Sequence, residues 1–177
     1  MSLVDRLPDP IETDRLVLTP LSASDAEDMV DTLSSPDLYV YIGGQPPTLD
    51  DLRSRYAVLT TGHSPDNSEE WLNWIVRLGN ADRRAIGTVQ ATVTEDGRRA
   101  EVAWVIGADG QGHGYGSEAA VAMVQSLVEA GVGHVTAHVH PEHVASAGVA
   151  RACHLFPTAE FHEGERLWEW RSDSRKG

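Results

Sequence analysis

The sequence predicts an α+β domain, in which helices and a sheet form separate layers. Two observations indicate this class. Three strand-like segments follow one another without a helix between them, at residues 71–78, 85–95 and 98–107. The other segments do not alternate regularly between strand and helix, so a doubly wound parallel sheet is not expected. The 177 residues are enough for a substantial core, and we expect a single domain over residues 1–177.

The first quarter of the chain predicts one strand and two helices. Residues 12–21 alternate between apolar and polar with period two, which is typical of a strand. Residues 22–33 predict a helix, in which Ser24 and Glu27 have the spacing of a capping box. Pro and Gly interrupt residues 34–47, so we expect a loop there. A second helix, capped by Thr48, should follow.

The remainder predicts strands first and then alternating elements. After the polar loop at 62–70 come the three successive strands, the last two joined by a tight turn at Asp96-Gly97. A helix over 117–130 then presents one apolar stripe. The segments beyond it predict a strand at 134–140, a helix at 142–153 and a closing hairpin at 156–171.

Composition excludes several classes of function. Lys and Arg total 14 against 27 Asp and Glu, a net charge of −13, so nucleic acid is not an expected partner while amines would be attracted to an acidic cleft. No apolar run approaches the roughly 20 residues of a membrane span. Residues 1–10 lack the apolar core of a signal peptide, and we expect a cytoplasmic protein. Cys153 is the only cysteine, which excludes an internal disulfide and a C-x-x-C zinc site.

A glycine-rich stretch between a predicted strand and a predicted helix is the strongest signal for a binding site. Gly110, Gly112, Gly114 and Gly116 alternate within seven residues. Backbone N–H groups in such a turn, at the start of a helix, face an anion, and glycine lets the backbone approach it closely. We therefore expect a phosphate-bearing ligand.

Two common phosphate-binding patterns do not fit this stretch. The dinucleotide fingerprint G-x-G-x-x-G fails because Tyr115 or Ser117 stands where the last glycine is needed. The P-loop G-x-x-x-x-G-K-[ST] fails because His113 and Gly114 replace its Lys and Ser or Thr. The ligand is therefore expected to be neither a dinucleotide nor a nucleoside triphosphate.

A third pattern fits. Residues 111–116 read Q-x-x-G-x-G, which resembles the acyl-CoA pyrophosphate loop of the GNAT superfamily of N-acetyltransferases. Residues 12–21, "ETDRLVLTPL", resemble the first strand of the branch that includes ribosomal-protein N-terminal acetyltransferases. Residues 100–119 and 138–158 resemble that branch's fourth strand with its loop, and its fifth strand with the following helix.

The resemblance implies a GNAT fold and a co-substrate. The fold would be a mixed, mostly antiparallel twisted sheet of about six to seven strands with about four helices, and strands 4 and 5 would be splayed apart. Acetyl-CoA would be the co-substrate, with its pyrophosphate at residues 111–117. The residues implied in binding it are Trp104, Val105, Ile106, Gln111, Gly112, His113, Gly114, Tyr115, Gly116, Ser117 and His143.

This chain departs from the family pattern at three positions, all occupied by histidine. His113 stands where the family often has Lys or Arg, so we expect one phosphate charge contact to be weaker. His143 stands where it usually has Asn, and His154 where it usually has Gly. None of the three removes the pyrophosphate loop itself.

The implied chemistry is direct transfer of the acetyl group to a primary amine in a ternary complex. The amine belongs to a peptide N-terminus or to a small molecule, and the enzyme is a monomer or a homodimer. Glu101, on the fourth strand, is the candidate base, directly or through water. Ser146 is the candidate donor to the leaving thiol, and a backbone N–H near Val105 faces the thioester oxygen. Glu118 is a second carboxylate, which suits the positive end of a helix.

Two other functions stay open on the residues alone. One is a GNAT-like domain that binds acyl-CoA without catalysis, as a sensor. The other is a metal-binding protein that uses the histidines of the predicted fifth strand and the turn after it. These histidines are His134, His138, His140 and His143. We expect no bound metal, because no carboxylate or cysteine in this segment completes a ligand set.

Overall fold

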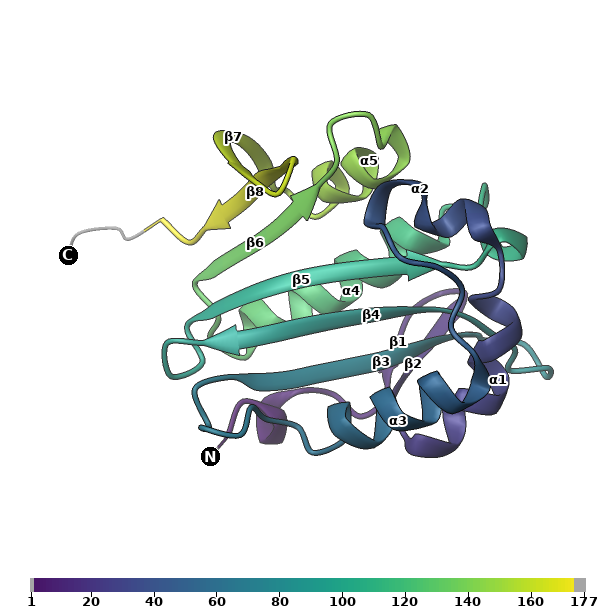
Figure 1. The fold of residues 1–177 in the computed structure, drawn as a ribbon. Helices are drawn as coiled ribbons and strands as arrows, with labels where there is room; N and C mark the ends of the chain where they lie inside the picture. The colour runs from purple at the N-terminus through teal and green to yellow at the C-terminus, as the bar shows by residue number, and fades with distance from the viewer. Residues whose placement is uncertain (1, 174–177) are drawn as a thin grey trace.

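Alternating apolar and polar residues build one eight-stranded sheet, in the order β1-β2-β3-β4-β5-β6-β8-β7 (Figure 1). The structure is a computed structural model and describes residues 2–173. Neighbouring strands are antiparallel, except that β5 and β6 are parallel. The strands are β1 (Ile11–Glu12), β2 (Leu16–Pro20), β3 (Glu70–Leu78), β4 (Ala85–Thr94), β5 (Arg99–Ile106), β6 (His134–Val139), β7 (Phe156–His162) and β8 (Glu165–Arg171).

Helices cover both faces of the sheet and give it two apolar cores. The larger core lies under α4 and includes Met123 and Leu127, and the smaller lies under α1 and α3 and includes Met29 and Leu52. Figure 1 shows α4 behind the sheet and α3 in front of it. The helices are α1 (Ala26–Thr32), α2 (Tyr39–Ile42), α3 (Leu49–Leu59), α4 (Tyr115–Glu129) and α5 (Val144–Ala152). The predicted α+β class is confirmed.

The structure has one strand more than the upper limit predicted, because residues 12–21 do not form a single strand. β1 and β2 pair with each other, with Ile11 opposite Leu18. Thr13 closes the turn between them: its N–H donates to the Leu16 carbonyl at 3.0 Å, and its Oγ1 accepts the Leu16 N–H at 3.0 Å. Period-two alternation continues through such a turn, so the pattern alone cannot separate the two strands.

Two further predictions near the N-terminus were wrong in detail. The capping box joins Ser22 and Asp25, not Ser24 and Glu27, because a 3₁₀ turn precedes α1; the Ser22 N–H donates to Asp25 Oδ2 at 2.7 Å. The segment predicted as a loop at 34–47 contains the short helix α2. By contrast, the Thr48 cap is confirmed, since its Oγ1 accepts the Asp51 N–H at 3.1 Å.

The parallel pairing of β5 and β6 is short, and this creates the splay. Arg99 to Glu101 pair with His134 to Thr136, and the two strands diverge beyond that point. β5 stays paired to β4 along its whole length, so only its β6 side is left open. These are the fourth and fifth strands of the sequence prediction, and the predicted position of the splay is confirmed.

Within residues 2–173, no helix has both the length and the apolar character needed to cross a membrane.

A glycine contrast tests the packing of β4 against β5. A Cβ on Gly87 would lie 2.2 Å from the Val105 carbonyl oxygen, so Gly87→Ala should lower the free energy of unfolding by about 2 kcal/mol or more. Gly148, in α5, has no atom within 4 Å of an added Cβ. Gly148→Ala should therefore raise the free energy of unfolding by about 0.5–1 kcal/mol, because glycine is unfavourable inside a helix. Urea unfolding curves measure both, and equal effects would contradict this packing.

Candidate active site

Two of the four alternating glycines have the backbone geometry expected of an anion-binding turn in the loop before α4. Gly112 and Gly114 have φ of +81° and +78°, and Gly114 caps the N-terminus of α4. Nothing lies within 4 Å of a Cβ built on Gly112, so the backbone there is open to a ligand. Gly110 differs, since its Cβ would lie 3.0 Å from Ile106. Gly110 therefore packs against Ile106, while Gly112 and Gly114 give the chain a positive-φ turn at the start of a helix, a position that favours an anion such as pyrophosphate.

Arg15, at the end of the β1–β2 turn, holds this loop in place. Its Nη1 donates to the His113 carbonyl at 2.9 Å, and its guanidinium lies 4.7 Å from the centre of the Tyr115 ring. The same side chain forms an ion pair with Glu118 at 2.6 Å. Sequence reasoning missed this role, although Arg15 lies in the "ETDRL" stretch that carries the family resemblance.

Glu118 is occupied by structural contacts. Its carboxylate accepts hydrogen bonds from Thr13 Oγ1 at 2.7 Å and from the Arg15 N–H at 3.0 Å, besides the ion pair. Burial acts to raise the pKa of Glu118, but the hydrogen bonds and the charge of Arg15 outweigh it and lower the pKa. The result is a fixed carboxylate at the positive end of α4, as the helix dipole favours.

A cavity of about 440 Å³ runs from this loop into the splay between β5 and β6. Asp37, Leu38, Tyr41 and Ile42 form one wall. The opposite wall comes from α5 and the residue before it. The cavity brings together most of the predicted site residues: Trp104, Val105, Ile106, Gln111, Gly112, Gly114, Tyr115, Gly116, Ser117, His143 and Ser146. His113 and Glu101 are not among its lining residues.

Ser146 and Trp104 meet across the splay. The indole Nε1 of Trp104 donates to Ser146 Oγ at 3.0 Å. The serine oxygen is thereby the acceptor in this bond, and its own proton stays available for donation into the cavity. This is the arrangement that a donor to a leaving thiolate requires.

The side chains of Gln111 and His113 make contacts with other residues of the protein. The Gln111 side-chain amide donates to the Ile106 carbonyl at 3.0 Å, which anchors the start of the loop to the end of β5. The His113 ring is exposed and stacks on Tyr115, with ring centroids 5.3 Å apart.

Tyr41, in the short helix α2, forms a wall that the sequence did not reveal. Its ring stacks on His143 with centroids 4.6 Å apart and lies 5.1 Å from His140. Burial lowers the pKa of His143, and the neighbouring imidazole of His140 lowers it further, so a neutral ring faces Tyr41 at neutral pH. The contact joins α2 to the start of α5 across the cavity.

Glu101 lies beside the splay on the other face of β5 from Trp104. Its side chain is 55% exposed, and its Oε1 is 3.5 Å from Nδ1 of His138 on β6. The exposure leaves the carboxylate accessible to an acceptor approaching the sheet from the α3 side.

The histidines predicted as a possible metal site are dispersed. His134 pairs with Glu169 at 3.0 Å, His138 faces Glu101, and His140 lies beyond the end of β6. No group of three or more His, Cys, Asp or Glu side chains in the described part of the chain is arranged to hold a metal ion. His154 has φ of +60°, which explains why the family usually has glycine there.

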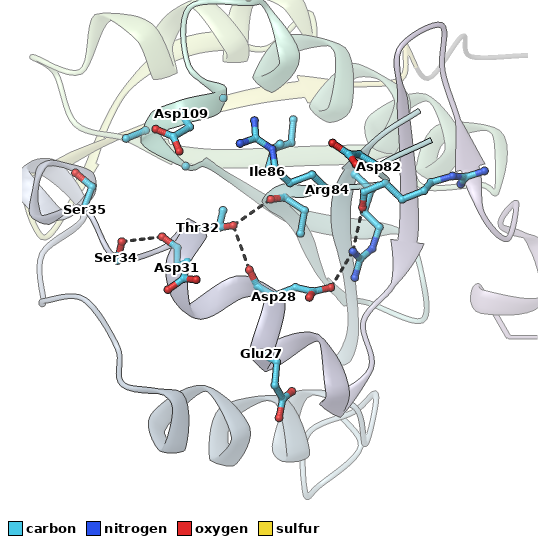
Figure 2. A pocket seen from close by; sticks show the side chains of 16 residues that line it. Glu27, Asp28, Asp31, Thr32, Ser34, Ser35, Asp82, Arg84, Ile86 and Asp109 are labelled. Atoms are coloured by element: carbon cyan, nitrogen blue, oxygen red, sulfur yellow. Dashed lines mark hydrogen bonds and ion pairs between the residues drawn. The ribbon is translucent and has the colours of Figure 1, made fainter. Parts of the chain in front are cut away.

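A larger cavity of about 750 Å³ lies between α1, the β3–β4 turn and the segment before the glycine loop (Figure 2). Carboxylates of Asp28, Asp31 and Asp109 surround it. Arg77 there is already bound to Asp25 at 2.7 Å and to Asp28 at 3.0 Å. This cavity is lined by neither Gly112, Gly114 nor Ser146, so the smaller one is the candidate active site.

The comparisons with known proteins agree with this geometry. A family model described as "Acetyltransferase (GNAT) domain" matches residues 15–155. The chain belongs to the GNAT acetyltransferase family. This membership confirms the predicted enzyme class, an N-acetyltransferase. No curated protein matches the chain.

Solved structures share the GNAT fold over nearly the whole chain. A GNAT-family acetyltransferase from Bacillus anthracis is 20% identical, with a TM-score of 0.75 over 92% of this chain and 98% of that one. The microcin C7 self-immunity acetyltransferase MccE, in complex with acetyl-CoA and AMP, is 15% identical, with a TM-score of 0.77 over 96% and 99%. A Salmonella typhimurium acetyltransferase that modifies the N-terminal serine of ribosomal protein L7/L12 is 14% identical, with a TM-score of 0.75 over 93% and 100%. The branch expected from the sequence is thus among the matched structures.

A charge contrast at Gly112 tests the pyrophosphate loop of this GNAT protein. Asp and Asn have the same shape and both tolerate positive φ, and the space before Gly112 is open. Gly112→Asp should weaken acetyl-CoA binding at least about tenfold more than Gly112→Asn, because only Asp places a negative charge before the phosphates. Calorimetric titration measures both. Equal affinities would show that the loop is only a turn.

A second prediction concerns the support of the loop by Arg15. Arg15→Ala removes the bond to the His113 carbonyl and the ion pair with Glu118, so acetyl-CoA affinity should fall about tenfold while the free energy of unfolding falls by about 1 kcal/mol. Arg53→Ala is the control, since Arg53 lies on α3 and pairs with Glu27 on α1. If both variants bind acetyl-CoA as the wild type does, Arg15 does not support the loop.

Proposed function

We propose that this protein is a single-domain N-acetyltransferase that moves the acetyl group of acetyl-CoA directly to a primary amine in a ternary complex. The observation that carries the proposal is the continuous path from the open backbone at Gly112 to the Trp104–Ser146 contact inside the splay. Along this path lie the glycine loop, the unpaired edge of β5 and the Ser146 hydroxyl. This is the order in which acetyl-CoA presents its pyrophosphate, its pantetheine arm and its thioester.

The unpaired edge of β5 supports the middle of this path. Beyond Glu101 the β6 side of the strand has no ladder partner, so its N–H and C=O groups are free to bond the amides of the pantetheine arm. A backbone N–H near Val105 is proposed to face the thioester oxygen, where negative charge develops during attack. Ser146 is proposed to donate to the departing thiolate.

The two substrates are proposed to approach the splay from opposite faces of the sheet. Acetyl-CoA enters along α4 and α5, while Glu101 faces the α3 side, from which an acceptor amine approaches. An amine must lose its proton before it attacks. A lysine-type amine is only about one part in a thousand neutral near pH 7.4, whereas an α-amine is about a quarter to a third neutral. A base therefore matters most for a lysine-type or polyamine acceptor.

The acceptor class we propose is the amine of a peptide N-terminus or of a small molecule. A net charge of −13 favours such cationic acceptors over nucleic acid. The similarity to the Salmonella typhimurium enzyme, which modifies an N-terminal serine, supports a peptide α-amine as the first acceptor to try.

The deciding experiment is a CoA-release assay against α-amines, lysine-type amines and polyamines, with mass spectrometry of the products. We expect transfer to at least one class, and Glu101→Gln should lower kcat/KM about 10²–10⁴-fold with acetyl-CoA affinity unchanged. The loss should shrink as pH rises, because the amine is then already neutral. The control is Glu160→Gln, an exposed carboxylate on the edge strand β7.

Two outcomes would contradict parts of the proposal. Binding of acetyl-CoA with no transfer to any amine would favour the sensor function instead. Full activity of Glu101→Gln on the best acceptor would show that Glu101 is a surface carboxylate.

A further inference from the structure

The strand β6 places a second proton-accepting group at the opening of the splay. Val135, Ala137 and Val139 point into the larger core, so His134, Thr136 and His138 share the opposite face. Thr136 is the last residue of β6 paired with β5, and its partner is Glu101. His138 is therefore two residues beyond the pairing, where the strands have diverged, on the same face as the Glu101 carboxylate.

The geometry of the pair assigns a role to each nitrogen of the imidazole. His138 Nδ1 is 3.5 Å from Glu101 Oε1, slightly longer than a hydrogen bond, and catalytic contacts of this length in a free enzyme often tighten in the substrate complex. A proton on Nδ1 facing the carboxylate leaves Nε2 with a free lone pair. His138 is also less exposed than its partner, at 23% against 55%.

We propose that His138 is a second proton-handling residue of acetyl transfer and that Glu101 acts on the acceptor amine through it. This inference rests on the proposed acetyltransferase function. The acceptor ammonium gives one proton to His138 Nε2, while Glu101 stabilises the imidazolium at Nδ1. The neutral amine nitrogen then bonds to the thioester carbon, the C–S bond breaks, and the second proton lost by nitrogen ends on the CoA sulfur.

Basicity explains why an imidazole improves on the carboxylate alone. A free imidazole titrates much closer to neutral pH than a free carboxyl group, so it is the better acceptor for an ammonium proton under those conditions. A carboxylate behind the imidazole orients the ring and stabilises its charged form, as in other carboxylate–histidine pairs. The same logic gives Glu101 a role as a positioning residue.

Other charged groups on this face could also affect the pH–rate profile, and the test must distinguish their effects from that of His138. The His138 and His162 rings have centroids 5.9 Å apart. His134 is bound to Glu169, which also accepts from Arg171 at 3.1 Å. The charged and titratable groups on this face of β5 to β8 include Arg99, Glu101, His134, His162, Glu165, Glu169 and Arg171.

The test compares His138→Gln with His134→Gln. The two histidines lie on one face of β6 and each faces a carboxylate, but His134 lies in the paired part of the sheet. His138→Gln should lower kcat/KM about 10²-fold at neutral pH and change the shape of the pH–rate profile. The acetyl-CoA dissociation constant should not change. His134→Gln should keep the wild-type profile.

A double variant tests whether the two residues act as a unit. Glu101→Gln with His138→Gln should lose no more activity than the worse single variant, because both remove the same proton transfer. His138→Asn gives a second reading if His138→Gln folds poorly.

The outcomes separate this inference from the function on which it rests. The role of His138 would be overturned if both His138 variants kept the wild-type pH dependence, or if the activity losses of the two single variants multiplied in the double variant. The proposed acetyltransferase function would then still stand. Wild-type protein that binds acetyl-CoA and acetylates no amine would overturn the proposed function and the role of His138 with it.

Discussion

Beyond Glu101, β5 loses its hydrogen-bonded neighbour on one side because β6 diverges after Thr136. Every proposed step of the reaction uses this divergence. It frees the backbone edge of Trp104 to Ile106, which lines the cavity, and Ser146 lies 3.0 Å from the Trp104 indole across it. If the strands stayed paired, the ladder would satisfy the same backbone groups and the sheet would be closed.

The glycine loop depends on a contact made far away in the sequence. Arg15 connects the first hairpin to the loop through the His113 carbonyl and to α4 through Glu118. Two positive-φ glycines are flexible by themselves, and an anion site is effective only when its N–H groups are held in place. The Arg15 contacts provide that support without placing a side chain in the open space before Gly112.

The proposed proton-handling and leaving groups occupy different faces of the same strand. Glu101 and His138 lie on the face that α3 partly covers, whereas Ser146 and the cavity wall of α5 lie on the other side. Alternation of side chains along β5 explains this, since Glu101 and Trp104 are three residues apart and therefore point in opposite directions. Two substrates can thus meet at the splay from opposite sides of the sheet.

The sequence alone was enough to predict the α+β class, which follows from strand periodicity. The family, the position of the splay and most of the cavity lining came from the resemblance that the Q-x-x-G-x-G string and its flanking segments carry. Two details depend on local hydrogen bonds, which periodicity does not predict. These bonds close the turn between β1 and β2 and form the first capping box at Ser22 and Asp25. Only the tertiary structure showed the contacts of Arg15 with Glu118, of Tyr41 with His143 and of Glu101 with His138. Each pair joins residues distant in the chain, and its distance is set by sheet register and helix packing, which no local pattern contains.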